Sequence, residues 1–100
     1  MKYRHTLTER ARKDIQEARQ WCEEAARTLG DALAKDVFAT IDTILERPRS
    51  FPEFEPGVRS ARCERFPYRV CFRIRPDDEI RVLAIYHLKR DPPRWNDPSR

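Results

Sequence analysis

The fold of this 100-residue chain is decided by the stretch Glu79-Ile80-Arg81-Val82-Leu83-Ala84-Ile85-Tyr86-His87-Leu88-Lys89-Arg90. Successive side chains of a strand point to opposite faces, so one face carries Ile80, Val82, Ala84, Tyr86 and Leu88. Leu83 and Ile85 make the opposite face apolar as well, so both faces of the middle of this strand must be covered. The stretch therefore predicts a central strand that delivers His87, Lys89 and Arg90 to one rim of a sheet.

Composition predicts one soluble globular domain over residues 1–100, because 39% of the residues are apolar and 38% are charged. No apolar run approaches the roughly 20 residues that a membrane helix needs, and the first residues lack the hydrophobic region of a secretory signal. We therefore expect a cytoplasmic protein without a membrane partner. The three cysteines are odd in number and show no CxxC spacing, which favours buried free thiols over a disulfide or a metal site.

Positive charge is concentrated in the last third of the chain. Residues 58–90 hold nine basic and four acidic side chains, a net charge of +5, whereas the whole chain carries +4. This asymmetry favours an anionic partner, either nucleic acid or an acidic protein segment. The alternative is that the arginines only decorate a solvated sheet edge.

The first half of the chain predicts a short strand followed by two helices. Residues 2–7 alternate as a half-exposed strand. Thr8, or Thr6 with Glu9 as a capping box, can cap a helix that runs to about residue 28. Gly30 is available as its left-handed terminator, and Asp31 can cap a second helix that Pro48 ends. Both helices carry an apolar stripe, and the second stripe includes Phe38. So short a connection predicts an antiparallel helical hairpin.

Three further strands follow a proline-rich segment. Residues 47–57 hold three prolines and one glycine, which predicts a stiff irregular loop. Residues 58–64 then indicate an edge-like strand, residues 68–75 a strand with one buried face, and residues 76–78 a tight turn into the central strand. The order β-α-α-β-β-β predicts an α+β fold, with the helical hairpin on one face of an antiparallel sheet. No glycine-rich phosphate loop, paired-carboxylate site or nucleophile elbow is present in the sequence.

These elements together resemble the RelE/ParE superfamily of bacterial toxins. The resemblance rests on the run Arg65-Phe66-Pro67-Tyr68-Arg69-Val70-Cys71-Phe72-Arg73-Ile74, on residues 80–90, and on Asp91-Pro92 through Trp95. It extends upstream through Thr8, Ala11, Asp14, Ile15, the second helix, Pro48 and Gly57. The family implies a compact toxin held by a cognate antitoxin, whose extended and partly acidic segment wraps the toxin, and it implies no cofactor or metal.

The superfamily implies two activities for such a chain. The ParE-like branch is associated with poisoning DNA gyrase, and the arrangement from His87 to Trp95 is closer to its pattern. The RelE-like branch cleaves messenger RNA on the ribosome, and on that alternative the candidate catalytic residues are Arg62, Arg69, His87 and Arg90. A third alternative is an inactive binding module of the same fold. The resemblance and the charge pattern nominate as antitoxin- or target-binding residues Arg59, Arg62, Arg65, Arg69, Arg73, Lys89, Arg90 and Trp95.

The roles of two residues, and of one segment near the end of the chain, bear on this choice. The intrinsic pKa of a histidine side chain suits a catalytic acid or base. A structural role is the simpler interpretation of His87, with its side chain hydrogen-bonded at the end of the strand. Tyr86 lies within the strand pattern and is expected in the core. The segment Arg94-Trp95-Asn96 stands where the ribonuclease branch often has a catalytic tyrosine, which favours the ParE-like activity.

Overall fold

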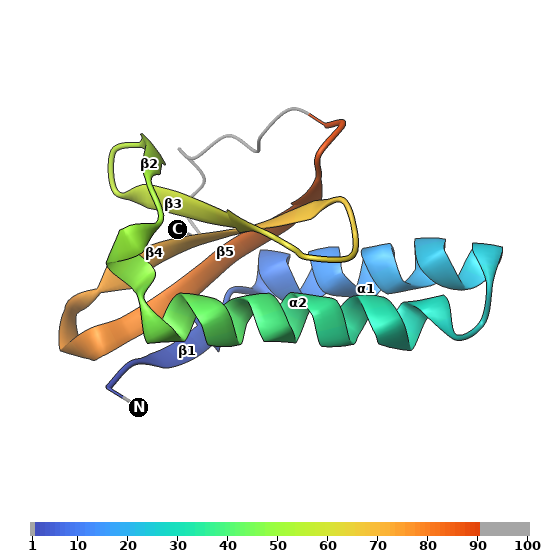
Figure 1. The fold of residues 1–100 in the computed structure, drawn as a ribbon, viewed down its shortest axis with the longest axis horizontal. Coiled ribbons are helices and arrows are strands. Elements are labelled where there is room, and N and C mark those ends of the chain that lie inside the picture. Colours follow the sequence, from blue (N-terminus) through green and yellow to red (C-terminus); the bar gives the residue numbers. More distant parts are fainter. Residues whose placement is uncertain (1, 91–100) are drawn as a thin grey trace.

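The computed structural model describes residues 2–90 and contains the predicted order of elements with one additional strand (Figure 1). The elements are β1 (Arg4–Leu7), α1 (Glu9–Ala25), α2 (Leu29–Glu46), a 3-10 turn (Pro48–Ser50), β2 (Glu53–Glu55), β3 (Val58–Arg62), β4 (Tyr68–Arg75), a second 3-10 turn (Pro76–Asp78) and β5 (Glu79–His87). Within the described residues, no helix combines the length and the apolar character that crossing a membrane requires.

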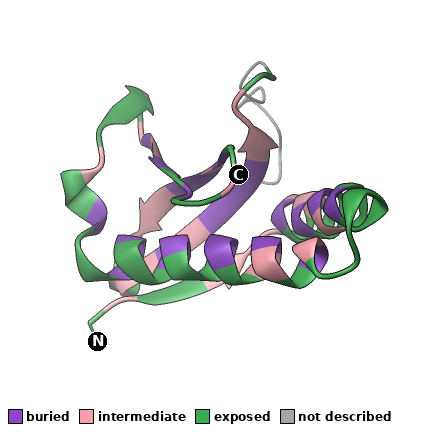
Figure 2. Ribbon diagram, turned by 45° about the vertical axis from the view of Figure 1, so that its right-hand side comes forward, coloured by how far each residue is buried: buried purple, intermediate pink, exposed green. Residues whose placement is uncertain are grey.

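The two helices bury one stripe each and expose the rest (Figure 2). Thr8 caps α1 as predicted, because its side chain accepts a hydrogen bond from the Ala11 amide at 3.0 Å. The buried stripes consist of Ala11, Ile15, Ala18 and Cys22 on α1, and of Leu33, Val37, Ile41, Ile44 and Leu45 on α2. Phe38 was predicted within the second stripe, but it is 40% exposed and contacts the His5 ring instead.

The helix–helix connection differs from its prediction. α1 ends at Ala25 and α2 begins at Leu29, so Gly30 lies inside the first turn of α2 and does not terminate α1. Asp31 does not cap α2 either; its side chain accepts a hydrogen bond from Arg19 at 2.9 Å. A Cβ atom on Gly30 would lie 2.4 Å from the carboxyl oxygen of Glu23, so glycine lets the Glu23 side chain lie against the start of α2.

The five strands form one sheet in the order β1-β5-β4-β3-β2. Three of the four strand pairs are antiparallel, and β1 pairs with β5 in parallel. β1 and β2 lie at opposite edges of the sheet, and the helical hairpin connects them across one face. The predicted α+β fold with the hairpin on one face of the sheet is therefore confirmed, and β5 lies inside the sheet between β1 and β4.

The proline-rich segment is more regular than predicted. Residues 48–50 form a 3-10 turn, and Glu53–Glu55 pair with β3, so β3 is not an edge strand. Gly57 makes the β2–β3 turn at φ +78°, a backbone conformation that favours glycine, and its amide donates to the Glu53 carboxylate at 3.0 Å. Three prolines restrict this segment without preventing three residues from pairing.

A bulge in β5 decides which side chains share a face. Phe72 pairs with Val82 and Cys71 with Ala84, so Leu83 is an extra residue. Ile80, Val82 and Ile85 consequently pack in the cluster that includes the helices, whereas Leu83 and Ala84 join Val58 and Cys71 in a second buried cluster. The predicted alternation was therefore wrong after Val82, and Tyr86 packs against the second cluster.

The start of α1 binds the backbone of β5 where β1 ends. The Thr8 amide donates to the Val82 carbonyl at 3.1 Å, and the Thr8 hydroxyl donates to the Leu83 carbonyl at 3.0 Å. One turn further on, the Asp14 carboxylate accepts from the Ile85 amide at 3.0 Å. β1 is too short to cover the whole of this edge of β5. Contacts from Thr8 and Asp14 bind backbone groups of the uncovered part as far as the Ile85 amide.

Candidate functional site: the arginine face and the α1–β5 groove

One face of the sheet gathers the arginines of three strands. The register pairs Arg62 with Arg69 and Arg73 with Arg81, and side chains of paired residues point to the same face. Val70 and Phe72 pack toward the helices, so the arginines between and beside them point away from the helices. We call this surface the arginine face and define it by Arg62, Arg69, Arg73, Arg75 and Arg81.

An ion pair and two buried guanidinium nitrogens characterise the electrostatics of the arginine face. Glu79 forms an ion pair with Arg81 at 3.3 Å, and its pKa is lowered by the hydrogen bond from Thr6 and by the charge of Arg81. The Nε atoms of Arg73 and Arg75 are buried, and neither has a hydrogen-bond partner among residues 2–90. Like charges that lie directly opposite each other on neighbouring strands destabilise a sheet. The charges of the pairs Arg62–Arg69 and Arg73–Arg81 therefore do not stabilise the sheet.

A cavity of about 460 Å³ lies at one end of the arginine face, and its lining includes Phe54, Ser60, Arg62, Arg69 and Tyr86. Arg69 donates to the Ser60 hydroxyl at 3.1 Å. Burial raises the pKa of Tyr86, and the charge of Arg69 opposes the rise only in part. Tyr86 is half-buried: it packs against the second buried cluster, as expected of a core residue, and also lines this cavity. Its hydroxyl stays protonated at neutral pH and can donate a hydrogen bond.

His87 lies on the helix side of the sheet, opposite to Arg62 and Arg69. It pairs with Tyr68, which packs in the helix-side cluster, and the two rings meet edge to face at 5.1 Å. Its Nδ1 atom accepts the Lys89 amide at 3.0 Å. The structure thus shows His87 as a hydrogen-bonded residue at the end of the strand. The four candidate residues of the ribonuclease alternative are divided between two surfaces, with Arg90 beside His87.

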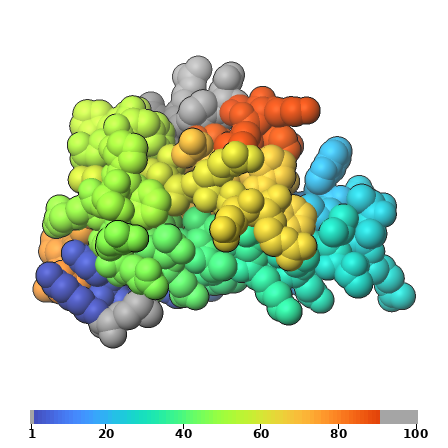
Figure 3. Space-filling view, viewed as in Figure 1, coloured from blue at the N-terminus to red at the C-terminus, as the bar shows by residue number. Residues whose placement is uncertain are grey.

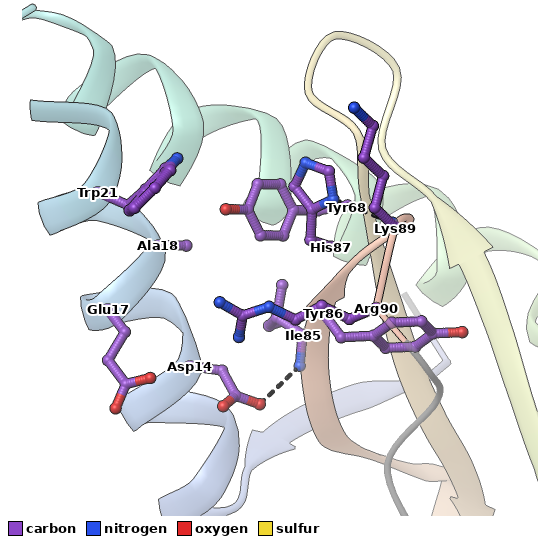
Figure 4. Close-up of a pocket in the computed structure, with 10 residues that line it drawn as sticks. All are labelled: Asp14, Glu17, Ala18, Trp21, Tyr68, Ile85, Tyr86, His87, Lys89 and Arg90. Carbon is purple, nitrogen blue, oxygen red and sulfur yellow. Dashed lines mark hydrogen bonds between the residues drawn. The ribbon is translucent and has the colours of Figure 1, made fainter. Parts of the chain in front are cut away.

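The second surface is a groove between α1 and the end of β5 (Figure 4). Its cavity has a volume of about 500 Å³, and we define this α1–β5 groove by its lining residues Asp14, Glu17, Ala18, Trp21, Tyr68, Ile85, Tyr86, His87, Lys89 and Arg90. In the space-filling view, the end of β5 lies next to the loop between β3 and β4 (Figure 3). Burial raises the pKa of Asp14, while its hydrogen bond from Ile85 and the charge of Arg10 oppose that rise.

Trp21 is the residue of this groove that our sequence interpretation overlooked. It is 70% exposed, more than any other large hydrophobic side chain among the described residues. A tryptophan outside the apolar stripe of an amphipathic helix has no core to fill, and exposed aromatic residues are typical of binding surfaces. Its position off the stripe Ala11–Ile15–Ala18–Cys22 was therefore the available signal.

The other residues predicted to bind the antitoxin or the target do not belong to the arginine face. Arg59 donates to the carbonyls of Arg49 and Phe51 and so holds the proline-rich segment on β3. The Arg65 guanidinium lies over the Phe66 ring at 5.8 Å. Lys89 is exposed at the end of β5, in the lining of the groove. Trp95 lies outside the described residues.

Metal-ligating and thiol chemistry receives no support from residues 2–90. These residues contain no group of three or more His, Cys, Asp or Glu side chains that could hold a metal ion. All three cysteines are free and buried, as the sequence predicted. Burial raises the pKa of Cys63 to about 11 and that of Cys71 to about 12, so both remain thiols at neutral pH.

Comparisons with solved structures relate this fold to known toxins. The structure is similar to the chromosomal ParDE toxin–antitoxin system from P. aeruginosa, with a TM-score of 0.78, 20% identity, and coverage of 88% of this chain and 98% of that chain. It is also similar to E. coli RelE, in a double arginine-to-alanine mutant bound to a peptide of its antitoxin RelBc, with a TM-score of 0.60, 20% identity, and coverage of 85% and 82%. The intact E. coli RelBE complex matches with a TM-score of 0.63, 17% identity, and coverage of 88% and 99%.

The sequence itself also matches a family model. A search of curated proteins finds no match. Residues 6–92 match the model described as the ParE toxin of the type II toxin–antitoxin system parDE. This match spans most of the chain, from β1 to beyond β5, and it agrees with the observed fold. The chain therefore belongs to the ParE toxin family of type II toxin–antitoxin systems.

Proposed function

We propose that this protein is a toxin that inhibits DNA gyrase by binding to it and that a cognate antitoxin neutralises it. Gyrase acts on DNA in the bacterial cytoplasm, and the proposal therefore places the toxin there. Family membership supports the toxin activity, and the choice between the two activities of the superfamily depends on the geometry of the candidate residues.

The observation that carries the proposal is the separation of His87 from Arg62 and Arg69. Cleavage at a ribose 2′-hydroxyl needs a group that takes the proton close to cations that neutralise the phosphate. Arg62 and Arg69 point away from the helices, whereas His87 packs on Tyr68 on the helix side. Tyr86 lies beside the arginines, but burial raises its pKa and makes it a poor proton acceptor. This arrangement supports binding in preference to cleavage.

The arginine face supports an acidic protein partner. It gathers five arginines, and Glu79 is paired with one of them, Arg81. An antitoxin segment that carries carboxylates would relieve the repulsion within the pairs Arg62–Arg69 and Arg73–Arg81. The related E. coli RelE binds a peptide of its own antitoxin.

The second candidate function is messenger RNA cleavage, and one observation favours it. Arg62, Arg69, Ser60 and Tyr86 surround one cavity, in which two guanidinium groups could hold a phosphate while the Tyr86 hydroxyl protonates a leaving oxygen. Such a site would use Tyr86 in place of His87 and would still need a base. The two candidates differ in their target, so they predict different cellular effects.

Inducible expression in bacteria tests the proposal. Gyrase inhibition predicts growth arrest with filamentation, loss of negative supercoiling and intact messages in primer extension. The double variant Arg62→Ala, Arg69→Ala tests the ribonuclease alternative, with Arg12→Ala, Arg27→Ala as an exposed control pair outside the arginine face. Codon-positioned cuts that the first double variant abolishes and the control retains would contradict the proposal. Expression without growth arrest would contradict the toxin activity itself.

A further inference from the structure

We propose that the arginine face binds the phosphate backbone of duplex DNA, so that the toxin contacts both gyrase and the DNA on which gyrase acts. This inference rests on the proposed action on gyrase and adds a second partner to it. The arginine face is defined by five arginines, and Glu79 is the carboxylate that is paired with Arg81. Five positive charges and one negative charge on these side chains favour a polyanion as ligand.

The arginine face is long enough to contact several phosphates of a duplex. Arg69 and Arg75 are six residues apart on β4, which places them roughly 20 Å apart at about 3.3 Å per residue. Arg62 and Arg81 lie on the strands to either side of β4, and neighbouring strands lie about 4.8 Å apart. Duplex DNA carries one charge per about 1.7 Å of its axis, so a length of roughly 20 Å presents about 12 phosphates. The five arginines can therefore meet different phosphates at the same time.

Three of the five guanidinium groups are held in place by their neighbours. Arg69 donates to the Ser60 hydroxyl at 3.1 Å, and Arg81 lies 3.3 Å from the Glu79 carboxylate. Arg73 lies against the β2–β3 turn, where its Nη1 atom is 2.6 Å from the position that a Cβ atom on the turn glycine would take. A guanidinium has five N–H donors, so a single such contact leaves donors for a phosphate. Side chains that are already held also lose less conformational entropy on binding.

Hydroxyl groups beside the arginines add further donors for phosphate oxygens. Ser60, Arg62, Arg69 and Tyr86 line the same cavity of about 460 Å³. The Tyr86 hydroxyl stays protonated at neutral pH, because burial raises its pKa. Arginine, serine and tyrosine side chains are typical of contacts to DNA phosphates, and such contacts carry no sequence information. We therefore expect binding to be independent of the base sequence.

DNA binding would also explain how the proposed antitoxin neutralises the toxin. An acidic antitoxin segment on the arginine face would cover the same charges that contact the phosphates. Because both partners need one surface, the antitoxin would release the toxin from DNA.

Fluorescence anisotropy of a labelled duplex of about 30 base pairs tests the inference, with the full toxin and without gyrase. Five phosphate contacts predict a slope of about −4.5 for the logarithm of the association constant against the logarithm of salt concentration. That slope corresponds to a loss of affinity of about 500-fold between about 50 and 200 mM salt. The double variants Arg62→Gln, Arg69→Gln and Arg73→Gln, Arg81→Gln each remove two contacts, so each should have a slope of about −2.7.

The matched control is Arg12→Gln, Arg27→Gln, which removes two charges from exposed positions outside the sheet and should keep the native slope. Circular dichroism shows which double variants fold, and the two arginine-face pairs are independent, so either one carries the test. A control that lowers the slope as much as the arginine-face variants would overturn the inference, because net charge alone would then explain binding.

A supercoiling assay with gyrase and the same toxin preparation separates this inference from the proposed function. Inhibition of gyrase by a toxin that does not bind the duplex at about 50 mM salt would overturn the inference and leave the proposed function intact. Duplex binding without inhibition would overturn the proposed function and support the DNA-binding surface alone. Single-stranded RNA of the same length that binds at least about tenfold more tightly than the duplex would overturn the inference in favour of an RNA site.

Discussion

Replacing Asp36 with alanine should destabilise the loop that joins β3 to β4. Asp36 is 5% exposed, and one of its carboxylate oxygens accepts the amides of Arg65 at 3.1 Å and Phe66 at 2.7 Å. A hydrogen bond to a charged group contributes about 1.5–3 kcal/mol. Two such bonds amount to about 3–6 kcal/mol, and relief from burying the carboxylate offsets part of this. We expect Asp36→Ala to lower the free energy of unfolding by about 3 kcal/mol.

Urea denaturation followed by circular dichroism measures this loss. Asp36→Asn keeps an oxygen acceptor without the charge, so its loss should be smaller, about 1–2 kcal/mol. The matched control is Asp42→Ala, which removes an exposed carboxylate from the same helix and should change stability by less than about 0.5 kcal/mol. A loss below about 1 kcal/mol for Asp36→Ala, with an unchanged denaturant slope, would refute the assignment of Asp36 as the anchor of this loop.

Three further predictions concern a turn, two thiols and a carboxylate. Gly57→Ala should lower the free energy of unfolding by about 1–3 kcal/mol in the same urea assay, because Gly57 has φ +78° and an added Cβ would lie 2.6 Å from Arg73 Nη1; an unchanged midpoint would contradict this. Cys63 and Cys71 should react with a thiol reagent at pH 8 only as fast as the protein unfolds, because burial raises the pKa of each to about 11 and 12; rapid labelling of the folded protein would contradict their burial. Glu79 has a lowered pKa in the folded protein, so the stability that it contributes is present above its unfolded pKa and is lost as the pH falls through the folded pKa. In Glu79→Gln, the free energy of unfolding should therefore decrease less steeply between about pH 5 and 2 than in the native protein. An equally steep decrease in the variant would show that other carboxylates dominate.

Periodicity predicted the regular parts of this fold because those parts follow ideal geometry. The stripe from Ala11 to Cys22 and the alternation from Tyr68 to Ile74 both match the structure. The strand Glu53–Glu55 was missed because proline content indicates an irregular backbone and three residues carry no periodicity. Gly30 was misplaced for a similar reason, since a glycine near a helix end indicates a terminator as readily as a close packing contact.

The candidate site could be predicted only up to the bulge in β5. Alternation along β4 correctly placed Arg69, Arg73 and Arg75 on the face opposite to Val70. The extra residue Leu83 exchanges the faces of the residues that follow it, so His87 lies on the helix side and Tyr86 on the other. An apolar run such as Val82-Leu83-Ala84-Ile85 satisfies both faces with or without a bulge. The sequence therefore could not show that His87 and Arg69 lie on opposite sides of the sheet.

The central claim is tested most directly by a supercoiling assay with purified gyrase, relaxed plasmid DNA, ATP and increasing concentrations of the purified toxin. We expect supercoiling to decrease as native toxin is added and the antitoxin to restore the activity of gyrase. The Arg62→Ala, Arg69→Ala toxin is measured in the same titration. Full supercoiling activity in the presence of excess folded toxin would contradict the claim that this protein acts on gyrase.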